Sequence, residues 1–508
     1  MANLKSLINS NKLKRNSMKA FHAYDIRGIY NVEFNKEDVY KIGFFLRELL
    51  NTDKILVGRD DRISSPEIHD FLLKGICDSG ADVYDLGLAT TPLVYFSTAI
   101  KCFDASVQIT ASHNPKQYNG LKISKTNALP VGYDTGLKTL ETWVNEGHEI
   151  QVVEKKGQVF DLDMKKDYLK FQLRYLGDIS NLNVTADLSN GMASLFIKDI
   201  LGEGVKASAN ANTKRPNIHY LFDIMDGNFP NHEANPLIPE NTAVLRKTVV
   251  ENGSDCGVIY DGDADRVAFV DENGRAISPD LMIAVLGNFF LKGCGSSPRA
   301  KEIQTELAKK ENLSAGTKMS RSVKRKLVTV IQDIRSSKAI GEYLAPMGGK
   351  MYTWKVGRAY AAPKLREIDG LFGGELAGHY YFKDFFYSDS GILASLILMD
   401  IVSQMKHKGV KLSELIDHII HYENSGEINF RIKDKQAAMD KVRNYFESKE
   451  TPTKVMDFDG YRLEFPDWWF NIRPSNTEPY LRFLCEATTK ELLAEKISIT
   501  RSIIEQFK

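Results

Sequence analysis

Apolar and polar positions follow two alternating patterns along most of the chain. KILVGRD (54–60) and DASVQI (104–109) have the short apolar runs or apolar–polar alternation of strands. SSPEIHDFLLKGICDSG (64–80) has apolar residues at helical spacing and ends at a glycine. Segments of these two kinds take turns from about residue 20 to 420. The alternation predicts α/β units in which helices cover the sheets.

The pattern changes near residue 421. SGEINFRIK, KVMDFDGYRLEFPDWWFNIRPS and YLRFLCEAT have the texture of antiparallel strands, and 435–448 and 489–507 that of helices. We expect a smaller α+β domain here. Before residue 421, a strand followed by a polar loop recurs at least three times. This recurrence indicates several similar α/β domains whose loops converge.

One segment, residues 292–326, differs in composition from its surroundings. It contains ten Lys or Arg and three Glu, between a helical pattern and a strand pattern. We expect a solvated surface insertion here rather than a basic binding element.

Composition excludes several classes of protein. With 43% hydrophobic and 26% charged residues, the chain has the composition of an ordinary soluble protein. Its net charge of +1 creates no overall electric field that would attract nucleic acid or an anionic membrane. Five scattered cysteines without CxxC spacing argue against a disulfide framework or a zinc site. No apolar run approaches the roughly 20 residues that span a bilayer. We therefore expect a cytoplasmic protein with no membrane or nucleic-acid partner.

The first 20 residues are basic and contain no acid. A transit peptide has this composition, but the segment lacks an apolar core. We expect a disordered extension instead, with Met18 as a possible working start.

The strongest chemical signal is GVIYDGDADRVAF, which contains Asp261, Asp263 and Asp265. On a straight strand these carboxylates would spread over roughly 13 Å, too far for one cation. Gly262 and Ala264 are small enough for the chain to curl, which would create an oxygen site for Mg²⁺. An Asp-rich turn without metal is the alternative.

An EF-hand is a poor explanation of the same residues. The position that must be glycine for the sharp turn is Arg266, and the flanks GVIY and VAFV have strand character rather than helix character. We therefore reject the EF-hand.

RPSNTEPYLR (473–482) is the densest cluster of hydrogen-bond donors in the C-terminal region. Hydroxyls, an amide and guanidinium groups are what a phosphate dianion needs. A polar hairpin turn would have the same composition, so this motif alone leaves both readings open.

Three further loops contain candidate groups. TASHNP (110–115) presents a hydroxyl at a strand exit, where it could react or could serve only as a turn or cap residue. GGELAGHYYF (373–382) offers a carboxylate for sugar hydroxyls and a histidine for proton transfer. AYDIRGIY (23–30) offers Tyr24, Asp25 and Arg27.

TASHNP, DGDADR, GGELAGH and RPSNTEPYLR, in this order and preceded by AYDIRG, resemble the α-D-phosphohexomutase family. The phosphomannomutase/phosphoglucomutase branch is the nearest match, and FPNHEANPL (229–237) also resembles that branch. The similarity runs from about residue 18 to the end, apart from the 292–326 segment.

The resemblance implies a fold and a cofactor. It implies three similar mixed-sheet α/β domains and a C-terminal α+β domain around one central cleft. We place these domains at 1–155, 156–276, 277–420 and 421–508. It also implies interconversion of hexose 1-phosphate and 6-phosphate, for mannose or glucose. Mg²⁺ would be the cofactor, hexose 1,6-bisphosphate the intermediate and activator, and the protein a monomer or dimer.

The resemblance also assigns roles to individual residues. Ser112 would be the phosphoserine and would bind Mg²⁺ with Asp261, Asp263 and Asp265. Lys122 and His379 would be the best proton-transfer candidates at a reacting end that also includes Arg27, His113 and Arg266. The substrate would contact Tyr24, Glu375, Ala377, Arg335 and Arg358. The phosphate that does not react would contact Arg473, Ser475, Asn476, Thr477 and Arg482.

Two positions depart from the branch pattern. Ala377 stands where serine is common, and Arg358 stands where histidine is usual. Arg358 is always charged and cannot act as a base. Both changes affect the expected sugar preference more than the reaction class. An amino-sugar phosphate mutase, a phosphatase, and an inactive homologue with a binding role are the alternatives. The GELAG sequence suits a hexose mutase better than an amino-sugar mutase.

Overall fold

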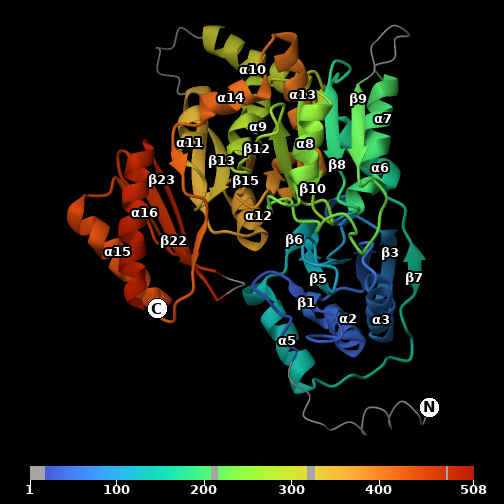
Figure 1. Cartoon of the computed structure of the whole chain (residues 1–508). Helices are drawn as coiled ribbons and strands as arrows, with labels where there is room; N and C mark the ends of the chain where they lie inside the picture. The colour runs from blue at the N-terminus through green and yellow to red at the C-terminus, as the bar shows by residue number, and fades with distance from the viewer. Residues whose placement is uncertain (1–17, 208–215, 317–326, 476–478, 508) are drawn as a thin grey trace.

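The computed structural model describes residues 18–207, 216–316, 327–475 and 479–507. It shows four sheets, one after another along the chain (Figure 1). The first three sheets are mixed and the last is antiparallel. This confirms the predicted fold class of α/β domains followed by an α+β domain.

The first sheet has the strand order β1-β5-β4-β2-β3-β7, with β6 paired to β5. Its strands are β1 (Ile26–Ile29), β2 (Lys54–Arg59), β3 (Asp82–Leu88), β4 (Ala105–Ile109), β5 (Tyr118–Lys125), β6 (Leu129–Pro130) and β7 (Val159–Asp161). Its helices are α2 (Lys36–Leu50), α3 (Ser65–Asp78), α4 (Thr91–Ile100) and α5 (Leu137–Glu146). Ile55 and Val57 of β2 pack in the core of α2, α3 and α5, while Leu56 packs in the core of α4. Helices therefore cover both faces, as the alternation predicts.

The first sheet continues beyond the predicted boundary at residue 155. Strand β7 pairs in parallel with β3, so Val159–Asp161 belongs to this sheet. All three residues of β7 are exposed. β7 has only three residues, too few for a recognisable strand pattern, which is why it was not predicted.

The second and third sheets repeat one scheme. The second has the order β12-β11-β10-β8-β9 and the third β14-β13-β15-β16-β17. The strands are β8 (Asn183–Asp187), β9 (Asn217–Leu221), β10 (Cys256–Tyr260), β11 (Val267–Asp271), β12 (Ala276–Ile277), β13 (Val328–Asp333), β14 (Gly349–Trp354), β15 (Phe372–Gly374), β16 (Tyr380–Phe382) and β17 (Ser388–Asp389). The helices are α6 (Lys165–Leu173), α7 (Ile197–Ala207), α8 (Ala243–Glu251), α9 (Leu281–Lys292), α10 (Pro298–Gly316), α11 (Lys338–Leu344), α12 (Arg358–Glu367), α13 (Gly391–His407) and α14 (Leu412–Ile419).

In each of the first three sheets, a parallel pair is followed by two antiparallel neighbours. The pairs β2–β4, β8–β10 and β13–β15 are parallel. Strands β4, β10 and β15 then pair antiparallel with β5, β11 and β16, and the next strand at that edge is antiparallel again. The recurrence of strand and polar loop in the sequence therefore reflects three repeats of one topology.

The basic segment 292–326 is only partly the solvated insertion that the sequence predicted. Its residues 298–316 form α10, and Ala300 and Ile303 are buried against the core that includes α9. The backbone amides of Ser296 and Ser297 donate to the carboxylate of Asp400 on α13. The expectation was wrong for the first part of the segment because the many charged residues around Ala300 and Ile303 masked their helical spacing. Residues 317–326 lie outside the described residues.

The C-terminal sheet has the order β18-β23-β22-β21-β20, with β19 also paired to β23. Its elements are β18 (Glu423–Asn424), β19 (Ile428–Phe430), β20 (Lys454–Met456), β21 (Tyr461–Glu464), β22 (Trp468–Pro474), β23 (Leu481–Ala487), α15 (Lys435–Lys449) and α16 (Lys490–Ile504). These elements confirm the predicted strands and helices.

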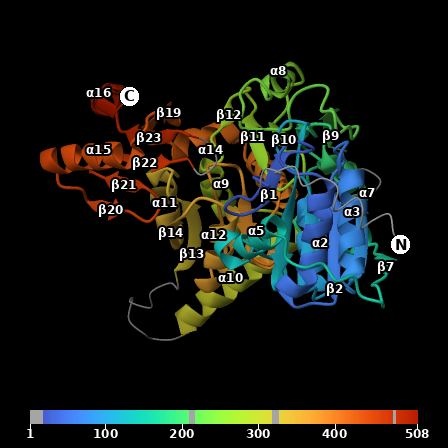
Figure 2. The same cartoon turned by 90° about the horizontal axis from the view of Figure 1, so that it is seen from below.

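The C-terminal domain docks on the third domain beside α11 and β14 (Figure 2). Arg462, 1% exposed, donates to the carbonyls of Ile334 and Ser336 at 2.9 and 2.6 Å. Ser337 donates to Glu486 at 2.8 Å. Buried polar contacts of this kind fix the relative position of the two domains.

Three other expectations concern the chain as a whole. Cys77, Cys102, Cys256, Cys294 and Cys485 are all free thiols, in agreement with the absence of a disulfide framework. Within the described ranges, no helix is long and apolar enough to span a bilayer. The expected N-terminal extension, residues 1–17, lies outside the described residues.

Candidate active site

Three of the predicted motifs occupy the same position in the repeated topology. TASHNP connects β4 to β5, DGDADR connects β10 to β11, and the ELAGH loop connects β15 to β16. A hydrogen bond joins the first loop to the second, and a hydrogen bond and a β-bridge join the second to the third. The three repeats therefore bring their equivalent loops to one place.

Ser112 lies at the point where the first two loops meet. Its hydroxyl donates to Asp261 Oδ2 at 2.6 Å and lies 3.2 Å from His113 Nδ1. Its backbone has φ 52°, the left-handed region that non-glycine residues rarely adopt. Strained backbone of this kind clusters at functional sites, because the surroundings must hold it.

Arg62 fixes the conformation of the loop that carries Ser112, here called the serine loop. Its guanidinium, which is fully buried, donates to the carbonyls of Ser112, Asn114, Pro115 and Tyr118 at 2.7–3.0 Å. Four charge-assisted bonds to one loop fix its backbone conformation. Sequence analysis did not select Arg62, since an arginine in a polar loop gives no signal of its own.

The aspartate loop curls as predicted. Ala264 adopts φ 63°, and ligand atoms of Asp261, Asp263 and Asp265 lie within 4.8 Å of one another. Strands β10 and β11 flank the loop as an antiparallel pair, which confirms the rejection of an EF-hand. Gly391 is required beside it, because a Cβ there would lie 2.6 Å from the carbonyl oxygen of Arg266.

The three aspartates are buried and only partly compensated. The Lys122 ammonium contacts Asp263 and Asp265 at 2.7 and 2.5 Å, and the Thr91 hydroxyl donates to Asp263. Burial and then repulsion from Asp263 and Asp265 raise the pKa of Asp261 well above its usual value. The cluster therefore favours an additional positive charge.

The residues fit a divalent cation. Oδ1 of Asp263 and Oδ1 of Asp265 are buried without a hydrogen-bond partner, which is costly unless something binds them. Carboxylate oxygens are the ligands that hard cations such as Mg²⁺ prefer.

Glu375 and His379 lie in the third loop. Glu375 is 2% exposed and accepts from the Tyr381 hydroxyl at 2.6 Å, and burial raises its pKa above the usual value. His379 Nδ1 lies 2.6 Å from Asp389, and its Nε2 accepts from Arg266 Nε at 2.8 Å. The loop therefore connects a carboxylate and an imidazole to the aspartate loop.

Arg335 supports the third loop indirectly. It binds Asp333 through two nitrogens, at 2.8 and 3.2 Å, and Asp333 accepts from the backbone amide of Leu376. Ala377 is half-buried in the same loop. A substrate role for Arg335 and Ala377 stays a prediction.

Arg358 spans two domains. Its Nε donates to Asp389 at 2.9 Å, its Nη2 donates to the carbonyl of Ala128 in the first domain, and its guanidinium lies 3.7 Å from the ring centroid of Tyr95. These contacts explain how an arginine is accommodated where a histidine is usual. Phosphate binding by Arg358 stays a prediction.

Arg27 and His113 lie beside the serine loop. Arg27 pairs with Asp25 and donates to Asn114 at 2.8 Å. Burial and then the charges of Arg266, Arg27 and Lys122 lower the pKa of His113 well below its usual value. Tyr24 is half-buried nearby in the chain.

The predicted phosphate clamp is described only in part. Arg473 and Arg482 are opposite each other on β22 and β23. Arg473 is 3% exposed and contacts Asp459 at 3.2 Å, and the amide of Ser475 donates to the carbonyl of Tyr480. Asn476 and Thr477 lie outside the described residues, so the clamp stays a prediction.

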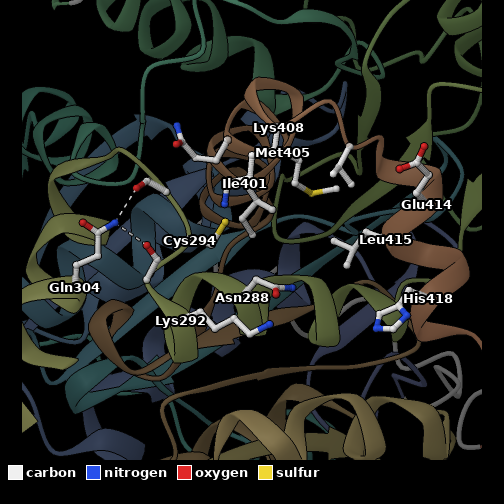
Figure 3. A pocket seen from close by; sticks show the side chains of 14 residues that line it. Asn288, Lys292, Cys294, Gln304, Ile401, Met405, Lys408, Glu414, Leu415 and His418 are labelled. Atoms are coloured by element: carbon white, nitrogen blue, oxygen red, sulfur yellow. Dashed lines mark hydrogen bonds between the residues drawn. The ribbon is translucent and has the colours of Figure 1, made fainter. Parts of the chain in front are cut away.

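A cavity of about 550 Å³ lies elsewhere, between α9, α13 and α14 (Figure 3). Apolar residues such as Ile401 and Leu415 and cations such as Lys292 and Lys408 line it, and Gln304 donates to the carbonyls of Gly293 and Gly295 at its edge. Among the described residues, no predicted site residue lines this cavity. It is therefore separate from the candidate site.

Four family models match consecutive parts of the chain. They are the phosphoglucomutase/phosphomannomutase alpha/beta/alpha domains I, II and III, over residues 18–150, 166–274 and 312–422, and the C-terminal domain, over 427–497. Together they cover well over half of the chain.

Curated relatives are similar over nearly the whole length. A phosphomannomutase of Methanocaldococcus jannaschii is 33% identical over 96% of this chain and 98% of its own. A phosphomannomutase of Escherichia coli K12 is 31% identical over 94% and 98%. A solved phosphoglucomutase/phosphomannomutase family protein from Burkholderia thailandensis matches with a TM-score of 0.77 at 25% identity, over 97% and 98%.

Proposed function

The chain belongs to the phosphoglucomutase/phosphomannomutase family and is an intramolecular phosphotransferase. We propose that it interconverts hexose 1-phosphates and 6-phosphates, with mannose or glucose as the sugar. The reaction proceeds through phosphorylated Ser112 and a hexose 1,6-bisphosphate. The observation that carries the proposal is the strained, buried Ser112, whose hydroxyl lies 2.6 Å from the first of three clustered aspartates.

The chemistry is a transfer of one phosphoryl group between oxygens. The bond from phosphorus to Ser112 Oγ breaks, the bond from phosphorus to a sugar oxygen forms, and the sugar hydroxyl loses its proton to a base. The bisphosphate then reorients so that its other phosphoryl group faces Ser112. Oγ attacks that group, which regenerates phosphoserine. The sugar oxygen that is released takes the proton back.

The described residues divide these tasks between charge and proton transfer. Asp261, Asp263 and Asp265 would hold Mg²⁺, which supplies positive charge to the oxygens of the transferred group. Lys122 and Arg266 add cations next to the same loop. His379 accepts a hydrogen bond at Nε2 and so has a lone pair there, which suits a proton acceptor.

Burial supports a transferase rather than a phosphatase. Ser112 is 1% exposed and Asp263 is fully buried. A phosphoserine at this position would be shielded from water, which otherwise competes with the sugar hydroxyl.

The substrate class rests on the relatives. Those of known name are phosphomannomutases and phosphohexose mutases. An Aspergillus fumigatus N-acetylphosphoglucosamine mutase, solved with GlcNAc-6P and magnesium, shares the fold at TM-score 0.52 and 14% identity. Similarity at this level supports the fold alone, so hexose phosphates are the first substrates to test.

A coupled assay tests the proposal. Wild-type protein with Mg²⁺ and a trace of hexose 1,6-bisphosphate is given mannose 1-phosphate or glucose 1-phosphate, and Ser112→Ala is the control. We expect conversion to the 6-phosphates by the wild type and none by the variant, with equal melting temperatures. Full activity of Ser112→Ala would exclude Ser112 as the nucleophile. If the protein converted only amino-sugar phosphates, these would replace the hexose phosphates as the proposed substrates.

A further inference from the structure

His379 uses both nitrogens of its ring in hydrogen bonds. Nδ1 lies 2.6 Å from Asp389 Oδ2, and Nε2 lies 2.8 Å from Arg266 Nε. The side chain of His379 is 9% exposed and that of Asp389 is fully buried. The imidazole is therefore held between a carboxylate and a guanidinium, away from solvent.

The chemistry of these two partners determines the tautomer. A guanidinium N–H can only donate, so Nε2 must accept and carries no proton. Nδ1 then carries the proton and donates it to Asp389. Nε2 thus keeps the lone pair that a proton acceptor needs.

Asp389 is itself held in place by the first domain. Its Oδ1 accepts from Arg358 Nε at 2.9 Å, and Arg358 is anchored to the Ala128 carbonyl and to the face of Tyr95. Burial alone would favour a neutral Asp389, but the hydrogen bond from His379 and the neighbouring Arg358 guanidinium lower its pKa below the usual value. A carboxylate with both oxygens engaged has little freedom to rotate.

A bound cation is the other use for this cluster, because Asp265, His379 and Asp389 lie close enough to share one. However, Nδ1 of His379 lies 3.9 Å from Asp265 Oδ1 but only 2.6 Å from Asp389. The short contact is a hydrogen bond, and it uses the nitrogen nearest to both carboxylates. The geometry favours an oriented imidazole over a metal ligand.

We infer that Asp389, held by Arg358, is a positioning residue that keeps His379 in the Nδ1–H tautomer with Nε2 directed to Arg266 and the aspartate loop. This inference deepens the proposed function and rests on it. In the transfer step, the proton of the sugar hydroxyl passes to Nε2 as the new phosphorus–oxygen bond forms, and Arg266 must release Nε2 for this to happen. Asp389 is not expected to touch the substrate.

Asp389→Asn tests the inference, because the amide has the shape of the carboxylate but can donate as well as accept. We expect kcat to fall at least about 10-fold with KM little changed, because loss of a carboxylate that orients a histidine costs about 10- to 100-fold at metal sites and about 10⁴-fold in a serine-protease triad. Asp384→Asn is the matched control. It removes a nearby carboxylate that also pairs with an arginine, Arg299, at 2.6 Å, and it lies outside the site. The control variant is expected to keep wild-type kinetics.

Two further measurements distinguish positioning from a structural role. In a His379→Asn background, Asp389→Asn is expected to lower the remaining activity less than about threefold, because the residue acts through His379. An equal loss in both backgrounds would overturn the inference. Ring ¹⁵N NMR of the full chain, labelled at histidine and assigned with His379→Asn, is expected to show the Nδ1–H form in the wild type and a shifted tautomer population in Asp389→Asn.

The NMR result separates failure of the inference from failure of the proposed function. If the wild type converts no sugar phosphate, the proposed function fails, and the spectrum still reports whether Asp389 sets the tautomer. An Nε2–H tautomer in the wild type, or an unchanged spectrum in Asp389→Asn, would refute the inference. A Zn²⁺-dependent shift of both His379 nitrogens at micromolar metal would replace it with a metal site.

Discussion

At Gly262, in the centre of the aspartate loop, one added methyl group should push the aspartate loop away from the loop that carries Ser112. A Cβ at Gly262 would lie 2.5 Å from the carbonyl oxygen of Ser112. Neither side can easily retreat. The Gly262 carbonyl accepts from the amide of Met192 at 2.9 Å, and the Ser112 carbonyl accepts from Arg62 at 2.8 Å.

The size of the effect follows from these distances. An ordinary carbon–oxygen contact is roughly 3.3 Å, so in Gly262→Ala the loops must part by about 0.8 Å. A similar displacement would stretch the 2.6 Å bond from Ser112 to Asp261 to about 3.4 Å, beyond the range of O–H···O hydrogen bonds. Misplacement by about 1 Å costs about 100-fold in rate, and overpacking costs about 1–3 kcal/mol of unfolding free energy.

The assay compares Gly262→Ala with Gly202→Ala. Gly202 lies on α7 with no atom near its added Cβ. Alanine there is expected to keep activity and to add up to about 1 kcal/mol of stability. We expect Gly262→Ala to lose about 100-fold in kcat and to bind Mg²⁺ more weakly by calorimetry. Wild-type kcat and Mg²⁺ affinity in a folded Gly262→Ala protein would show that the two loops do not act as one site.

Three further predictions concern the surroundings of the site. Arg62→Met should lower the unfolding free energy by about 3–5 kcal/mol in urea titrations and abolish turnover, because it leaves Asp60 and the serine-loop carbonyls without their partner. Burial and then the charge of Asp60 raise the pKa of Asp61 to about 7, so the folded state binds its proton more tightly than the unfolded state. Wild-type stability should therefore fall relative to Asp61→Asn as the pH rises from about 4 to 7, and equal pH profiles of the two melting temperatures would exclude this. Deletion of 310–326 should leave the reaction intact in the coupled assay, whereas deletion from residue 296 should destabilise the protein, because it also removes buried Ala300 and Ile303.

The parts of the fold predicted from sequence are those with a strong local pattern. Strands with buried residues, such as β4 and β10, and a helix with apolar residues at helical spacing, α3, were identified. The exposed strand β7 and the packed face of α10 were not, since β7 has only three residues and charged residues surround Ala300 and Ile303 in α10. The position of β7 is decided by β3, a partner distant in the sequence, and that of α10 by packing against the neighbouring helix α9.

The same reasoning separates the site residues that were found from those that were missed. Ser112 and the three aspartates stand in short motifs whose composition is unusual. Arg62, Thr91 and Asp389 act by binding groups on other segments. Arg62 binds the Ser112 carbonyl, Thr91 the carboxylate of Asp263, and Asp389 the imidazole of His379. A single arginine, threonine or aspartate at the end of a strand has no local signature, so tertiary structure is needed to recognise it.

The two departures from the branch pattern now differ in what they imply. Arg358 contacts Asp389, the Ala128 carbonyl and Tyr95, so it stabilises the interface between the first and third domains. Replacing it by histidine would shorten the side chain and remove the fork that reaches both domains. The methyl side chain of Ala377 cannot form hydrogen bonds of this kind, and it lies half-buried in the loop that carries Glu375. Any difference in sugar preference is therefore expected to arise at Ala377, and Ala377→Ser is the variant in which to measure the ratio of kcat/KM for mannose and glucose phosphates.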